Sequence, residues 1–245
     1  SGDLSLSLLL PAFITSIISM IASVLIPRMT HIYATCKSPA LVKEIAFSQR
    51  ILSAFATVPI SIVIIFSDEF FKLWIPSEYT PLLTDLSIIL LLPLLIHSNM
   101  WCIFSANIVI NKIKKLSLIL LFLGILNVFF CILLFNILTP SIYIIPVISV
   151  VINIVFYLVI VPNLTARNLM ISKVLFYIPI FKSILFSLSF ILLFTTLKSY
   201  LTVDNWTSLF LYSVLFGGLG IVIHLFILMT RLEVINLYKN FKELF

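Results

Sequence analysis

Charge is scarce in this sequence of 245 residues. Only 10% of the residues are charged, against roughly 25% in an average soluble domain, whereas 62% are hydrophobic. This composition excludes an ordinary soluble fold. The apolar runs also lack the alternation of apolar and polar residues that marks the strands of a membrane β-barrel, which leaves a helical membrane protein.

Motifs that carry catalysis or bind metal are missing as well. The sequence contains no HExxH, no GxSxG and no phosphate-binding Walker loop. No acidic residue lies inside the apolar runs, so no pair of carboxylates is available there to hold a metal or to move a proton. We therefore expect no enzyme, no cofactor and no metal site. The three cysteines, Cys36, Cys102 and Cys131, give no disulfide framework.

Apolar runs recur along the whole chain, and most have the length of about twenty residues that a helix needs to cross a hydrocarbon layer of about 30 Å. We predict an all-α integral membrane bundle over residues 1–229. Its seven spans are 4–26, 51–66, 86–110, 116–138, 142–161, 174–197 and 206–229. The second run is short, but Ser38 as N-cap and Pro39 as first helical residue would extend it backward.

The net charge of +6 is distributed in step with the spans. Most acidic residues lie in the second, fourth and sixth connections. By the positive-inside rule, this predicts an outside N-terminus and a cytoplasmic C-terminus. Charges that alternate in this way do not form a patch for nucleic acid. The basic residues of the other connections and the tail are Arg28, Lys37, Lys43, Arg50, Lys112, Lys114, Lys115, Arg167, Lys173, Arg231, Lys239 and Lys242.

Three ionisable residues lie inside the predicted spans, where each is costly enough to suggest a function. His97, with Ser98 and Asn99 beside it, would face an aqueous cavity or a proton-coupling site, or would be a neutral histidine bonded to a neighbouring helix. Lys182 would extend to the headgroups or bind an anionic lipid. His224 is expected to be a packed or interfacial histidine.

Small polar residues recur in the first span, where Thr15, Ser19 and Ser23 are four residues apart. Such stripes indicate close helix packing, as do Ser213 and Gly217 in the last span. The alternative is a cavity wall that ends at Arg28. An arginine there would pair with a diphosphate through two parallel hydrogen bonds, so Arg28 is the principal candidate for a substrate contact.

Aromatic residues crowd the segment FFKLWIPSEYT, which lies in the connection between the second and third spans. Phe70, Phe71, Trp74 and Tyr79 would rest at the level of the lipid headgroups and form an interfacial anchor or, alternatively, a lid. The tail over 230–245 carries an apolar stripe that is typical of an interfacial helix on the cytoplasmic leaflet, although it would also suit a continuation of the last span.

Three stretches, taken in order, resemble a known family. SGDLSLSLLLPAFITSIISMIASVLIPRMTHIYA is similar to a helix that begins GxYSLA and ends in a proline before a cytoplasmic loop. RILSAFATVPISIVIIFSDEFFKLWIPSEYT resembles a proline-containing span that leads to (I/L)xxLW(I/L)GxxY, and SANIVINKIKKLSLILLFLGILNVFF resembles a GxxK turn before a helix with LNxxL. Residues 1–161 thus resemble the C-terminal half of the Wzx-type polysaccharide flippases of the multidrug/oligosaccharidyl-lipid/polysaccharide exporter superfamily. Asp3, Pro76, Ser77 and Asn111 depart from the family pattern.

The resemblance implies a fold of two bundles that alternates between cytoplasm-open and outside-open states, with this chain as a C-terminal fragment and the N-terminal bundle missing. The implied substrate is an undecaprenyl-diphosphate-linked oligosaccharide, moved across the bacterial inner membrane for O-antigen or capsule synthesis. Partners would be membrane lipids and the polysaccharide polymerase and chain-length machinery. The alternatives are a drug or small-cation antiporter of the same superfamily, which an acidic residue inside the spans would favour, and a seven-helix membrane protein that does not transport.

Overall fold

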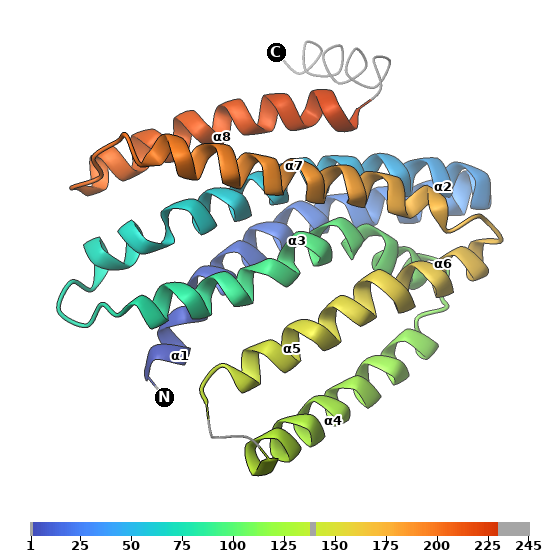
Figure 1. Ribbon diagram of the computed structural model, residues 1–245. Coiled ribbons are helices and arrows are strands. Elements are labelled where there is room, and N and C mark those ends of the chain that lie inside the picture. The colour runs from blue at the N-terminus through green and yellow to red at the C-terminus, as the bar shows by residue number, and fades with distance from the viewer. Residues whose placement is uncertain (1, 138–140, 230–245) are drawn as a thin grey trace.

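The computed structural model describes residues 2–137 and 141–229, and this part of the chain is helical with short connections and no strand (Figure 1). The elements are α1 (Gly2–Ser7), α2 (Leu9–Trp74), α3 (Pro81–Val109), α4 (Lys114–Ile137), α5 (Ile144–Val155), the π-helical turn η1 (Phe156–Ile160), α6 (Val161–Leu169), α7 (Val174–Lys198) and α8 (Trp206–Leu228).

Seven helical stretches of the described residues are long and apolar enough to cross a membrane. They are Gly2–Cys36, Ser38–Trp74, Pro81–Val109, Lys114–Ile137, Ile144–Leu169, Val174–Lys198 and Trp206–Leu228. The predicted all-α membrane fold with about seven spans is therefore confirmed. The orientation of the two termini remains a prediction, and the predicted interfacial helix over 230–245 lies outside the described residues.

The long helix α2 contains the first two predicted spans and folds back on itself between Cys36 and Ser38 (Figure 1). Pro39 accounts for a bend here, because it cannot donate a hydrogen bond to the carbonyl four residues earlier and its ring collides with that carbonyl. The two arms of α2, 9–36 and Ser38–Trp74, run antiparallel. Two contacts between the arms show this course. Close to the bend, Arg28 of the first arm pairs with Glu44 of the second. Far from the bend, Leu10 of the first arm lines a cavity together with Phe70 of the second.

Residues 27–50 differ from the prediction, because the structure holds all of them in helix rather than in a loop between spans. The extension of the second helix back to Ser38 is present, and the helix also continues to Trp74. The prediction set the ends of each span where charged residues begin. A helix whose backbone hydrogen bonds are satisfied internally does not stop at that point.

The second arm of α2 is the most enclosed of the seven spans. The first arm and α3 pack on it through a core that contains Ile18, Leu52 and Leu91, and α7 and α8 cover another side. The span formed by α5, η1 and α6 packs on α3, and α4 lies outermost against α5 (Figure 1). Only one residue of α4, Leu116, is buried.

The helix α3 is followed by a residue, Asn111, whose backbone is in the left-handed conformation. Asn111 has φ 55°, and the N–H of Lys112 donates to the carbonyl of Asn107 at 2.8 Å, which closes the end of the helix. Asparagine tolerates this conformation better than other side chains do, apart from glycine.

Glycines let α8 approach its neighbours closely, as the sequence predicts for the region of Gly217. A Cβ atom on Gly217 would lie 3.0 Å from Ile62, and one on Gly220 would lie 2.8 Å from Phe190 and 2.9 Å from Val58. The same atom on Gly218 would meet nothing within 4 Å. Gly220 thus sits where α8 meets both α2 and α7.

We expect Gly220→Ala to destabilise the bundle, since overpacking a tight contact costs about 1–3 kcal/mol, which outweighs the roughly 1 kcal/mol that alanine gains over glycine in a helix. The measurement is thermal unfolding of the purified protein in detergent. Gly218→Ala is the matched control and should be neutral or stabilising. Equal midpoints for the two variants would contradict the close packing at Gly220.

Candidate functional site

Arg28 forms an ion pair across the bend of α2. Its Nε donates to Oε1 of Glu44 at 2.8 Å, and its guanidinium lies 5.3 Å from the centre of the Phe47 ring. The Glu44 side chain is only 7% exposed and also accepts a hydrogen bond from Ser48 at 3.3 Å, whereas the Arg28 side chain is 55% exposed. The pair therefore holds Arg28 through Nε, while more than half of its side chain stays exposed.

Glu44 is the residue of this site that the sequence analysis missed. The sequence analysis placed Glu44 in a connection between spans, whereas the second membrane-length helix begins at Ser38 and buries Glu44. That helix has 37 residues, or about 55 Å of length, against a hydrocarbon layer of about 30 Å. Glu44, close to its start, then lies near headgroup depth rather than at the membrane centre.

The small polar stripe of the first arm does not join Arg28. The hydroxyls of Thr15, Ser19 and Ser23 donate to carbonyls of their own helix at 2.8, 2.9 and 2.6 Å. With 3.6 residues per turn, Arg28 lies roughly 180° around the helix from Ser19. The structure thus places Thr15 and Ser19 on a different side of α2 from Arg28.

His97 and Asn99 also point to different sides of their helix, α3. The His97 ring packs against Trp101 and Tyr157, with ring centres 4.8 and 4.4 Å apart. Asn99 is fully buried; its Nδ2 donates to the carbonyl of Leu95 at 2.6 Å, and its Oδ1 has no partner among the described residues. These two residues do not form one polar patch.

The partner of His97, Tyr157, belongs to the π-helical turn η1. In such a turn the backbone hydrogen bonds span five residues, as from the N–H of Val161 to the carbonyl of Phe156. The hydroxyl of Tyr177 on α7 donates to the carbonyl of Leu158 in the same turn at 2.5 Å. Turns of this kind often lie at functional sites, so His97 remains a candidate.

Lys182 and His224 differ sharply in environment. Lys182 is exposed on α7, which is compatible with both readings of it, extension towards the headgroups and binding of an anionic lipid. His224 is fully buried, stacks on Phe186 with ring centres 4.2 Å apart, and lies 3.0 Å through Nε2 from the hydroxyl of Ser183. His224 is thus a packed histidine within the bundle.

The predicted anchor residues divide into a buried part and an exposed part. Phe71 is completely buried against Leu10 and Leu83, so its ring packs on protein. Phe70 is half-buried and contacts the ring of Trp74, which is 40% exposed. Trp74 is therefore the member of this set best placed to meet lipid headgroups.

Tyr79 fastens the connection to the end of α2. Its hydroxyl donates to the carboxylate of Asp68, which also pairs with Lys72 at 2.5 Å. This hydrogen bond, together with burial and the negative charge of Asp68, raises the pKa of Tyr79 above its ordinary value. The connection is thus fixed to the bundle by polar contacts as well as by its aromatic rings.

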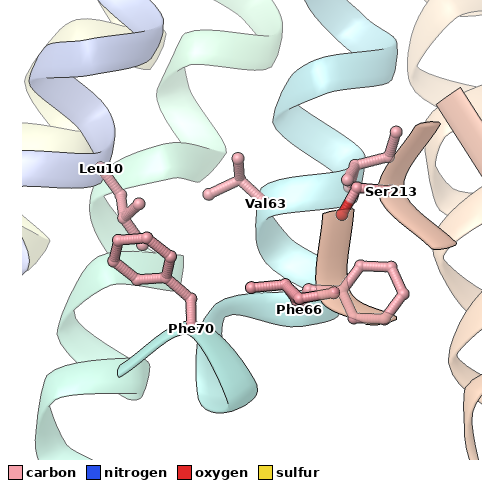
Figure 2. Close-up of a pocket in the computed structure, with 7 residues that line it drawn as sticks. Leu10, Val63, Phe66, Phe70 and Ser213 are labelled. Atoms are coloured by element: carbon pink, nitrogen blue, oxygen red, sulfur yellow. The ribbon is translucent and has the colours of Figure 1, made fainter. Parts of the chain in front are cut away.

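A small apolar cavity lies beside Phe70 (Figure 2). It measures about 80 Å³ and is bounded by both arms of α2 and by α8. Its lining is Leu10, Ile62, Val63, Phe66, Phe70, Leu209 and Ser213. With one hydroxyl in an otherwise apolar lining, this cavity has no group that would bind a charged ligand.

Among the residues that the structure describes, no three histidine, cysteine, aspartate or glutamate side chains come close enough together to hold a metal ion. Comparison with protein-family models, with curated proteins and with solved structures found no match. The flippase resemblance therefore remains a hypothesis.

If Arg28 and Glu44 form an ion pair, the stability lost on removing Arg28 should depend on whether residue 44 carries a charge. Arg28→Ala leaves a buried carboxylate without its cation, and we expect a loss of about 1 kcal/mol, less than for a fully buried pair because Arg28 is half-exposed. In a Glu44→Gln background the same change should cost little. Unfolding in detergent measures this double-mutant cycle, with Arg167→Ala as a control at an exposed arginine. Additive losses would contradict the pairing.

Proposed function

We propose that this chain forms part of a translocase that moves a lipid-linked oligosaccharide diphosphate across a membrane. The observation that carries the proposal is Arg28, half-exposed and held in one orientation by the buried carboxylate of Glu44. Arginine binds phosphate groups through parallel hydrogen bonds from its planar guanidinium. A guanidinium fixed through Nε presents its terminal nitrogens with less loss of side-chain entropy than a free one.

The distribution of charge supports the same ligand. Lys43, Lys112, Lys114 and Arg167 are all exposed and, like Arg28, lie near the ends of helices that meet at one end of the bundle (Figure 1). At the opposite end lie the acidic groups of Asp68 and its neighbours. A lipid diphosphate approaching the basic end would be attracted before it reached Arg28.

The sequence resemblance gives the proposal its substrate class. Under it, the glycan and diphosphate cross between this bundle and a second one while the polyprenyl tail stays in lipid, and the protein alternates between two open states. The direction, from the cytoplasmic to the outer leaflet, is also part of what the resemblance implies. The orientation predicted from charge would place the basic end at the cytoplasmic face, where such a substrate starts.

A cation antiporter of the same superfamily is the second candidate, because Glu44 is a buried acidic residue within a membrane-length helix. Its ion pair with Arg28 weighs against this reading, since the arginine already neutralises the carboxylate. Glu44→Gln separates the two functions. It should reduce flipping only in part, by loosening Arg28, but would abolish transport that depends on a free carboxylate.

The test is restoration of surface glycan in cells that lack their own translocase, with the gene that encodes this chain expressed at full length. Arg28→Ala should reduce surface glycan strongly, and Arg28→Lys should restore part of it, because lysine keeps the charge but not the paired donors. Arg167→Ala serves as the matched control, and membrane abundance is measured for every variant. Full activity of Arg28→Ala at normal abundance would exclude Arg28 from the site.

A further inference from the structure

A row of buried polar side chains runs along the interface of α2 with α7 and α8. Its members are each at most 1% exposed. The second arm of α2 provides four of them at four-residue spacing, α7 provides two at the same spacing, and α8 provides one. We call this set the polar seam: Gln49, Ser53, Thr57, Ser61, Ser183, Ser187 and His224.

Direct hydrogen bonds join the helices at three levels of the seam. Gln49 donates through Nε2 to the carbonyl of Phe176 at 3.0 Å. Ser53 contacts Ser183, whose hydroxyl in turn lies 3.0 Å from Nε2 of His224. Further along, the hydroxyls of Ser61 and Ser187 are 2.8 Å apart.

Two atoms of the seam are buried without a hydrogen bond among the described residues. They are Oε1 of Gln49 and Oγ1 of Thr57. Nδ1 of His224 has no strict hydrogen bond either, but it interacts with the backbone of Ala54. A buried polar atom without a partner costs about 1–3 kcal/mol, so native proteins usually satisfy it with an internal water molecule. The atoms of Gln49 and Thr57 therefore point to water inside the seam.

The spacing of the seam sets how many water molecules it needs. Four residues of helix rise about 6 Å, whereas a water molecule that bonds two oxygens spans at most about 5.5 Å, so one level is joined to the next by two waters or by one water and an inclined side chain. Waters placed in this way between the levels of Gln49, Ser53, Thr57 and Ser61 would complete a hydrogen-bonded chain. Such a chain of hydroxyls, water and imidazole has the composition of a proton path.

Polar groups continue from both ends of the seam. At one end Gln49 adjoins Ser48, which bonds Glu44. At the other end, one turn beyond Ser61, the carbonyl of Ile65 accepts a hydrogen bond from Lys198 at 2.7 Å, and Lys198 pairs with Glu69 at 2.8 Å. Glu44 and Glu69 thus stand at the two ends of the row.

We propose that the polar seam binds a chain of internal water molecules and passes protons along it through His224. Ser183 gives its hydroxyl proton to Nε2 and takes one from Ser53, which is resupplied by a water molecule at Gln49. Nδ1 then releases its proton to a water molecule at Thr57, which leaves the imidazole with its proton on Nε2. Rotation of the ring about the Cβ–Cγ bond exchanges the two nitrogens and restores the first arrangement. One proton enters and one leaves, so the seam is unchanged.

The first test measures water in the seam. The protein is labelled with ¹⁵N-histidine, placed in lipid bilayers and studied by solid-state NMR with magnetisation transferred from water. Because His31→Gln and His97→Gln remove the other two histidine signals, His224 is assigned without being changed. We expect rapid transfer from water to His224, and its absence would overturn the proposal.

The second test measures proton flux with the protein in vesicles that contain a pH-sensitive dye, under a potential set by potassium and valinomycin. Thr57→Val keeps the shape of the side chain but removes its hydroxyl, so flux should fall several-fold. Thr30→Val is the matched control, because Thr30 is exposed on the first arm and bonds the carbonyl of Ile26 at 3.0 Å. Equal flux through both variants would exclude proton transfer through the seam even where water is present.

Discussion

The enclosure of the second arm of α2 is the constraint on which the rest of the bundle depends. This helix meets the first arm and α3 on one side and α7 and α8 on the other, so its surface must fit four neighbours. It does so with small and β-branched residues, including Ala54, Ala56 and Val58, which are completely or almost completely buried. Close approach of helices through small residues is the usual source of association in lipid, where apolar surface alone gives little preference.

The same enclosure explains where polar groups are placed. In lipid, a hydroxyl that faces outward has only its own helix to bond, and Ser16 and Ser23 on the first arm follow this pattern. Hydroxyls on the second arm face protein instead, and Ser53 and Ser61 bond across to α7. Cross-helix hydrogen bonds fix the register of α7 against α2, which apolar packing alone specifies less strictly.

The sequence was sufficient to predict the number of spans and their order, because lipid requires long apolar runs and few other constraints compete. It was less informative about helix ends, since Arg28 and Glu44 interrupt the apolar pattern without interrupting the helix. The close packing near Gly217 was predicted from small residues alone. The partners of the buried polar residues were not predicted. They depend on which helices are neighbours, and packing rather than local sequence decides that.

At the candidate site, too, the sequence identified single residues but not which of them lie together. Arg28 was recognised from its position at the end of an apolar run, but the stripe of Thr15 and Ser19 was assigned to the same wall. Helical periodicity already separates them, by roughly half a turn between Ser19 and Arg28. Glu44 could not be paired with Arg28 without the bend at Pro39, and that bend makes residues on both sides of a predicted connection face one another.

Glu44 connects the two polar systems of the protein. Its carboxylate accepts from Arg28 on the exposed side and from Ser48 next to the seam. Because one buried carboxylate makes both contacts, a change of the residue at position 44 alters the orientation of Arg28 and the hydrogen bond of Ser48 together. The partly exposed guanidinium and the enclosed second arm of α2 are therefore not independent of one another.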